Sequence, residues 1–212
     1  MTVVSSVENA HVEHRVRSLR QSPLGARAEE LAARSNGGAR GVRLSEEAFL
    51  TQINLRVDPV SPAVTRVENA LALPLPHQAP NEVRGDEQNA ILWLGPDEWL
   101  LVAPDGRAAD LLTDVGSALG ESPGSVVDVS ANRTTLRLSG PMAGEVLAKV
   151  CSLDLHPRVF GPGQCAQTLA GRAQIVLWQV DEEPSYRLMV RCSFAHYLAD
   201  LLLDAMEEFV VS

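Results

Sequence analysis

The strongest constraint on the fold is a pattern that occurs twice in the chain. The segment NLRVDPVSPAVTRVENALALPLP aligns with TLRLSGPMAGEVLAKVCSLDLHP at a constant offset, which matches Arg56 with Arg137 and Pro76 with Pro157. In each copy a strand pattern leads into an apolar helical stripe that ends at prolines. Coincidence between two amphipathic patterns is the alternative, but the matched arginines and prolines favour duplication of one α+β unit.

The spacing of apolar residues predicts the elements of the first copy. Strands are expected in FLTQINLRV and over 125–129, and helices from Ser61-Pro62 to about Leu73 and over 108–119. Between the helices, ILWL and EWLLV flank Gly95-Pro96-Asp97, where proline followed by aspartate favours a tight hairpin turn. The order strand, helix, strand, strand, helix, strand is that of a ferredoxin-like split βαβ unit.

Two of the three tryptophans flank this hairpin turn. Continuous apolar runs are typical of strands that are covered on both faces, so Trp93 and Trp99 are expected to be core or interface anchors. Trp178 takes the corresponding place in the second copy, where IVLWQVDEEPSYRLMV resembles the hairpin. Stacking on a flat ligand such as a pterin is an alternative role, and a protein interface, where Trp and Arg are enriched, is another.

The predicted fold class is therefore α+β, with two ferredoxin-like halves in a pseudo-twofold arrangement. Residues 1–44 are interpreted as a polar, partly extended N-terminal arm with at most one helix, at about 26–34. Residues 45–131 form the first α+β half and residues 132–212 the second, which ends in an amphipathic helix over 193–210.

Composition excludes several classes of partner. A formal net charge of -9 and a pI near 5.0 argue against a nucleic-acid surface. The sequence shows no signal peptide and no apolar run of about 18 residues, so no membrane contact is expected. Cys151, Cys165 and Cys192 are odd in number and form no C-x-x-C pair, which favours a reducing, cytoplasmic location.

The sequence contains no recognised catalytic motif. It lacks a G-x-S-x-G elbow, a phosphate-binding G-x-x-x-x-G-K and a G-x-G-x-x-G between strand and helix. Asp97 fits a hydrogen-bonding role in its turn, and Asp128 and Arg133 in DVSANR fit a tie between the halves better than a site for a substrate carboxylate. We therefore predict no catalytic, cofactor-binding or metal-ligating residue in this chain.

Several long segments in the right order carry a family resemblance. FLTQINLRVDP, LP and PN at 75–81, LWLGPDEWLL, DVSANRTTLRLSGP and LDLHPRVFGPGQCAQTLA together resemble the gamma subunits of heterotetrameric sarcosine oxidases. The resemblance runs from about Ser22 to the C-terminal helix. It also extends to the folate-binding domain of glycine-cleavage aminomethyltransferases, which implies that fold.

The resemblance implies a non-catalytic, structural subunit. The complex oxidatively demethylates sarcosine with O2 and tetrahydrofolate to glycine, hydrogen peroxide and methylenetetrahydrofolate. FAD, FMN, NAD, tetrahydrofolate and zinc would be held by the alpha, beta and delta subunits, and this chain would pack mainly on the large alpha subunit. The interface or structural candidates are Trp93, Asp97, Trp99, Asp128, Arg133 and Trp178.

A stand-alone folate-binding enzyme with this fold is the alternative. One form is an aminomethyltransferase, but no aspartate-and-arginine set maps onto its pterin site. The other is a folate-binding protein of iron–sulfur assembly, whose motif is Lys-Gly-Cys followed by Gly-Gln-Glu. Here Gly163-Gln164-Cys165-Ala166 lacks both the lysine and the glutamate, so the role of that cysteine is not transferred to Cys165.

Overall fold

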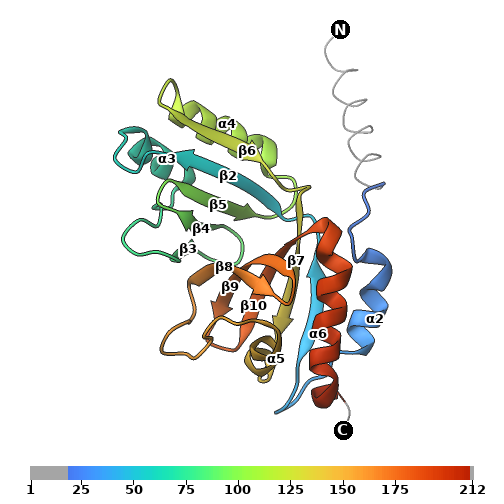
Figure 1. Cartoon of the computed structure of the whole chain (residues 1–212). Helices are drawn as coiled ribbons and strands as arrows, with labels where there is room; N and C mark the ends of the chain where they lie inside the picture. Colours follow the sequence, from blue (N-terminus) through green and yellow to red (C-terminus); the bar gives the residue numbers. More distant parts are fainter. Residues whose placement is uncertain (1–18, 211–212) are drawn as a thin grey trace.

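The computed structural model describes residues 19–210, and its strands form two five-stranded antiparallel sheets (Figure 1). The first 18 residues of the predicted arm lie outside the described part. The first sheet has the order β3-β4-β5-β2-β6 and the second the order β1-β7-β10-β9-β8. The α+β class is confirmed.

Along the chain, two helices are interspersed among the strands of the first sheet. Its strands and helices are β2 (Thr51–Val57), α3 (Ala63–Leu71), β3 (Val83–Gly85), β4 (Ala90–Gly95), β5 (Glu98–Ala103), α4 (Ala108–Leu119) and β6 (Gly124–Asp128). The predicted helices and strands are present, whereas β3 was not predicted because three residues carry too little periodicity.

The second sheet combines the C-terminal part of the chain with one N-terminal strand. Its elements are β1 (Arg43–Glu47), β7 (Arg133–Ser139), α5 (Ala143–Val150), β8 (Gln164–Ala170), β9 (Ala173–Asp181), β10 (Ser185–Arg191) and α6 (Ala195–Val210). A 3-10 turn at Gly25–Arg27 and helix α2 (Ala28–Ala33) precede β1, close to the helix predicted at 26–34. Another 3-10 turn, Cys192–Phe194, leads into α6.

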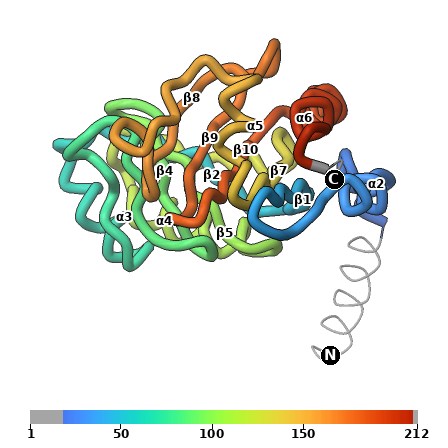
Figure 2. Tube along the Cα trace, turned by 90° about the horizontal axis from the view of Figure 1, so that it is seen from below, coloured from blue at the N-terminus to red at the C-terminus, as the bar shows by residue number. Residues whose placement is uncertain are grey.

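The sheets are stacked between two layers of helices (Figures 1 and 2). Helices α3 and α4 cover the outer face of the first sheet around Leu55 and Trp99, and α5 and α6 cover that of the second around Leu136 and Leu188. Between the sheets lies a third cluster that contains Leu92, Leu100, Cys165, Val176, Trp178 and Met189. Apolar burial on both faces of both sheets is the main source of stability.

The hairpin around Pro96 is covered on both faces, as its apolar runs predicted. Ile91 and Leu101 face the helices, whereas Leu92 and Leu100 face the second sheet. Strands β4 and β5 pair with only Pro96 and Asp97 between their ends. This confirms the tight turn.

Strand β1 lies where the sequence did not predict it. Residues 45–47, assigned above to the first half, pair with β7 in the second sheet, from Ser45 opposite Arg137 to Glu47 opposite Thr135. Helix α2 lies beside α6 (Figures 1 and 2). Arg27, in the 3-10 turn before α2, forms an ion pair of 2.7 Å with Asp200 of α6. The segment before β2 therefore completes the second sheet, because its partner is distant in sequence and local periodicity carries no information about it.

No helix within residues 19–210 combines the length and apolar character needed to cross a lipid bilayer.

Candidate functional site

Two arginine pairs lie on the inner face of the second sheet, which is the face toward the first sheet. Arg137 of β7 is directly opposite Arg187 of β10, and Arg133 is directly opposite Arg191. Side chains two residues apart on a strand point to the same face, so the pairs flank Met189, which lies in the core between the sheets. We call Arg137 and Arg187 the paired end and Arg133 and Arg191 the open end.

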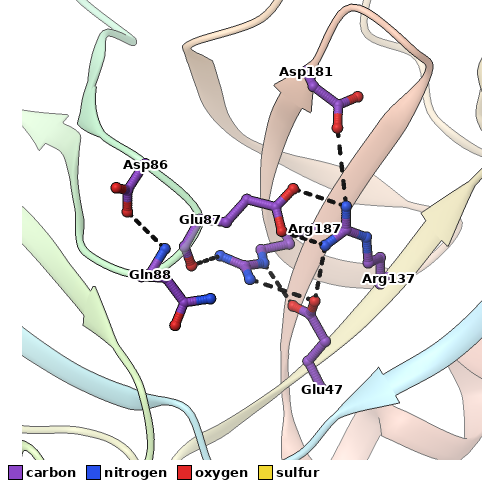
Figure 3. A network of polar contacts seen from close by, with 7 residues as sticks. All are labelled: Glu47, Asp86, Glu87, Gln88, Arg137, Asp181 and Arg187. Atoms are coloured by element: carbon purple, nitrogen blue, oxygen red, sulfur yellow. Dashed lines mark hydrogen bonds and ion pairs between the residues drawn. The ribbon is translucent and has the colours of Figure 1, made fainter.

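The paired end is neutralised by carboxylates from two distant segments (Figure 3). Glu47 of β1 accepts a hydrogen bond of 2.6 Å from Arg187 Nε and one of 3.2 Å from Arg137 Nη1. Glu87, in the loop between β3 and β4, accepts two bonds from Arg137, of 2.7 and 2.9 Å. Such a bidentate arrangement is the strongest geometry for an arginine and a carboxylate.

Arg187 is almost entirely buried, with 4% of its side chain exposed. Its Nη1 donates to the backbone carbonyl of Glu87 at 2.8 Å, and its guanidinium lies 5.0 Å from the ring centroid of Trp178. A buried guanidinium needs this full set of partners because desolvation of an unpaired charge is costly. Since Glu87 lies in a loop that connects two strands of the first sheet, the paired end joins the two sheets.

Asp86, which precedes Glu87, stabilises the loop that carries both residues. Asp86 Oδ1 accepts hydrogen bonds from the backbone amides of Gln88 and Asn89, at 2.8 and 2.9 Å. These bonds lower the pKa of Asp86, and the hydrogen bonds from Arg137 lower that of Glu87. Asp181 lies 4.0 Å from Arg137, but burial raises the pKa of its carboxyl. The hydrogen bonds from Arg137 thus outweigh burial at Glu87, whereas burial outweighs the charge of Arg137 at Asp181.

The open end has no such partners. Among residues 19–210, neither Arg133 nor Arg191 has an ion pair or a side-chain hydrogen bond to a protein group. Burial and the charge of Arg191 lower the pKa of Arg133, while the charge of Glu98 opposes this shift. A hollow of about 370 Å³ lies over the pair and is lined by Arg133, Gln167, Thr168, Leu169, Gln174, Ile175, Val176 and Arg191.

The three tryptophans occupy three different environments. Trp99 is fully buried under α3 and α4, and its Nε1 donates to the carbonyl of Pro76 at 2.8 Å. Trp178 is buried between the sheets, and its Nε1 has no hydrogen-bond partner among the described residues. Trp93 is opposite Trp99 but only partly buried. They therefore do not form one stacking platform for a flat ligand.

Asp97 and Asp128 make local structural contacts. Asp97 is exposed at the hairpin tip, where it lies 3.8 Å from Arg56 and its carbonyl accepts from the amide of Val57. Asp128 accepts bonds of 2.9 and 2.5 Å from the amide and hydroxyl of Ser130. Asp128 and Arg133 line one hollow of about 410 Å³, but they form no ion pair.

The three cysteines lie apart from one another and form no disulfide in the described part of the chain. Cys151, Cys165 and Cys192 are free thiols. Burial raises the pKa of Cys165 to about 12, so its nucleophilic thiolate form is scarce at neutral pH. Within residues 19–210 no three His, Cys, Asp or Glu side chains gather as metal ligands would.

Sequence reasoning missed most of the charged residues described above. Arg137 was noted only through its match with Arg56, and nothing marked Glu47, Glu87 or Arg187. These side chains come from separate strands and one loop, so no motif spacing connects them. The strand period places Arg133 and Arg137 on one face, which is the only signal that could have been used.

Comparison with known proteins assigns the family. Residues 56–208 match the model of the sarcosine oxidase, gamma subunit family. Sarcosine oxidase gamma subunits from Corynebacterium sp. strains P-1 and U-96 are 42% and 43% identical over 192 residues. These alignments cover 91% and 90% of this chain and 92% of each relative.

Solved structures agree with this assignment. A chain of the heterotetrameric sarcosine oxidase from Corynebacterium sp. U-96, in complex with pyrrole 2-carboxylate, is 42% identical with a TM-score of 0.85, covering 92% of this chain and 98% of that chain. The glycine cleavage system aminomethyltransferase T from Bartonella henselae is 17% identical with a TM-score of 0.61, covering 87% of this chain and 57% of that chain, and so shares the fold. This chain belongs to the sarcosine oxidase gamma subunit family.

Proposed function

We propose that this chain is a non-catalytic subunit of a heterotetrameric sarcosine oxidase and packs mainly on the large alpha subunit, with beta and delta subunits completing the assembly. The observation that carries the proposal is the match to a chain of the solved heterotetramer, at 42% identity over 98% of that chain. At this identity and coverage, the surfaces used for assembly are expected to be retained.

The proposed reaction is the oxidative demethylation of sarcosine with O2 and tetrahydrofolate to glycine, hydrogen peroxide and methylenetetrahydrofolate. FAD, FMN, NAD, tetrahydrofolate and zinc belong to the other subunits in this proposal. In support, the carboxylates of Glu47 and Glu87 are occupied by arginines and the Cys165 thiol is buried. These groups serve the fold rather than a chemical step.

We further propose two ferredoxin-like halves related by a pseudo-twofold axis. The strand orders support this, since β3-β4-β5-β2-β6 has the same form as β8-β9-β10-β7-β1. The order 2-3-1-4 of a split βαβ unit corresponds to β4-β5-β2-β6 and to β9-β10-β7-β1. In the second half the fourth strand comes from the N-terminal arm, with the halves dividing near residue 131.

We place the assembly in the cytoplasm, with three free thiols in support.

The test of the proposed function is affinity purification of the tagged full-length chain from its native cell extract at modest salt. We expect stoichiometric flavoprotein partners, identified by mass spectrometry and flavin absorbance, and sarcosine-dependent peroxide formation. Recovery of a colourless protein without partners that binds tetrahydrofolate would favour an independent folate-binding protein instead.

A further inference from the structure

We propose that the open end, Arg133 and Arg191, docks carboxylate side chains of another subunit. The inference rests on the proposed function, because it requires that the chain has partner subunits. It goes further by naming the surface and the chemistry of the segment that meets it, which is acidic.

The first argument is the uncompensated charge. Like charges directly opposite each other on antiparallel strands destabilise a sheet, and Arg133 is directly opposite Arg191. At the paired end, Glu47 and Glu87 offset the repulsion between the two opposed arginines of the same strands. The chain has a net charge of -9, yet no carboxylate of residues 19–210 forms an ion pair at the open end, where Glu98 attracts Arg133 only from a longer distance.

The second argument is partial desolvation. Arg133 is half-buried, and burial is the largest influence that lowers its pKa. A guanidinium that has already lost part of its water gains more from a carboxylate than an exposed one does. The hollow of about 370 Å³ above the pair leaves room for such a side chain.

The third argument distinguishes a protein segment from a small molecule. Pockets for small ligands enclose most of the ligand surface. Here the lining side chains of Gln167, Gln174 and Arg191 are exposed, and Leu169 is 47% exposed. A shallow surface with arginines, amides and an exposed leucine is typical of a protein interface, in which arginine is enriched.

A cross-linking experiment identifies the acidic partner. Lys149 is the chain's single lysine, so Arg191→Lys adds one amine at the open end while it keeps the positive charge. The purified complex with this variant is treated with a carbodiimide, which couples amines directly to carboxylates, and the linked peptides are mapped. We expect links from position 191 to Asp or Glu of another subunit.

Two mapping results would overturn the proposal. Links from position 191 only to acids of the same chain, such as Glu98, Asp128, Glu8 or Glu13, would assign the open end to an internal contact. The absence of any link from position 191, under conditions where Lys149 links to Glu208, its ion-pair partner, would show that no carboxylate is within reach.

A charge-removal experiment measures the contribution of the open end. In Arg133→Gln/Arg191→Gln, the rate at which a labelled chain exchanges out of the complex is expected to rise about tenfold or more, because loss of a desolvated ion pair acts on dissociation. The effect should shrink as salt is added. The matched control is Arg158→Gln, an exposed arginine without a side-chain hydrogen bond to residues 19–210, which should exchange at the wild-type rate.

Failure of this inference is distinguishable from failure of the proposed function. If the wild-type chain enters no complex, the proposed function is wrong. If the wild-type chain assembles and the double variant exchanges no faster than Arg158→Gln, the subunit assignment stands and the docking site is wrong.

Discussion

Each end of the strand pair β7 and β10 carries two arginines directly opposite each other, but only one of these pairs has carboxylate partners. At the paired end, Arg137 and Arg187 share Glu47 and are joined to Glu87. At the open end, Arg133 and Arg191 have no acid partner among residues 19–210. The difference shows that residue type alone does not decide whether an arginine forms an ion pair within the fold or keeps its charge without such a partner.

Topology decides between these outcomes. Strand β1 adds Glu47 beside β7, and the β3–β4 loop of the first sheet brings Glu87 over the same place. At the open end no carboxylate of the described chain comes within ion-pair distance, and the hollow there is lined by Arg133 and Arg191 with residues of β8 and β9. Three predictions test this contrast.

The largest effect is expected from Glu47→Gln. The substitution leaves the buried Arg187 guanidinium without its charged partner, and loss of one member of a buried pair costs about 3 kcal/mol or more. Denaturant unfolding of the full-length chain measures the free energy of unfolding. Glu145→Gln is the control, since Glu145 is exposed on α5 and forms no ion pair with residues 19–210. Equal stability of the two variants would show that Glu47 is not needed to balance Arg187.

A smaller effect with a distinctive pH dependence is expected from Glu87→Gln. The hydrogen bonds from Arg137 lower the pKa of Glu87 below 4.5, so its contribution is fully present above that pH and is lost as the pH falls through the folded-state value. Because the side chain is 38% exposed and Glu47 still contacts Arg137, we expect a loss of about 1 kcal/mol at neutral pH.

Unfolding of wild type and Glu87→Gln across pH 2 to 7 gives the difference between them as a function of pH. It should disappear at the acidic end, provided that both proteins remain folded there in the absence of denaturant. A difference that persisted at low pH would mean that packing or hydrogen bonding, rather than the carboxylate charge, accounts for the effect.

The smallest effect on the free energy of unfolding is expected from Arg191→Gln. Removing one of two opposed like charges should leave the stability of the full-length chain within about 0.5 kcal/mol of wild type, and if anything raise it. Thermal and denaturant unfolding are measured alongside Arg158→Gln. A loss above about 2 kcal/mol would indicate an internal partner for Arg191, and the contrast between the two ends would fail.

Much of the local structure could be predicted from the sequence. The hairpin around Gly95-Pro96-Asp97 and the helices α3 and α4 follow from apolar periodicity and turn chemistry, which act within a few residues. The burial of Trp99 follows from the same runs. The family could also be identified, because long segments in the right order are specific.

Which charged side chains form ion pairs depends on the tertiary structure. The polar segment RLSEE forms β1 because it pairs with β7, and this pairing places Glu47 beside Arg187. Since β7 lies far along the chain, no local pattern indicates the pairing. Arg133 and Arg137 share one strand and one face, yet only the second meets carboxylates. Sequence determines which side chains share a face, because the strand period is local. Only the packing of distant segments determines which of them find a partner, because an ion pair requires two groups within a few ångströms whatever their separation along the chain.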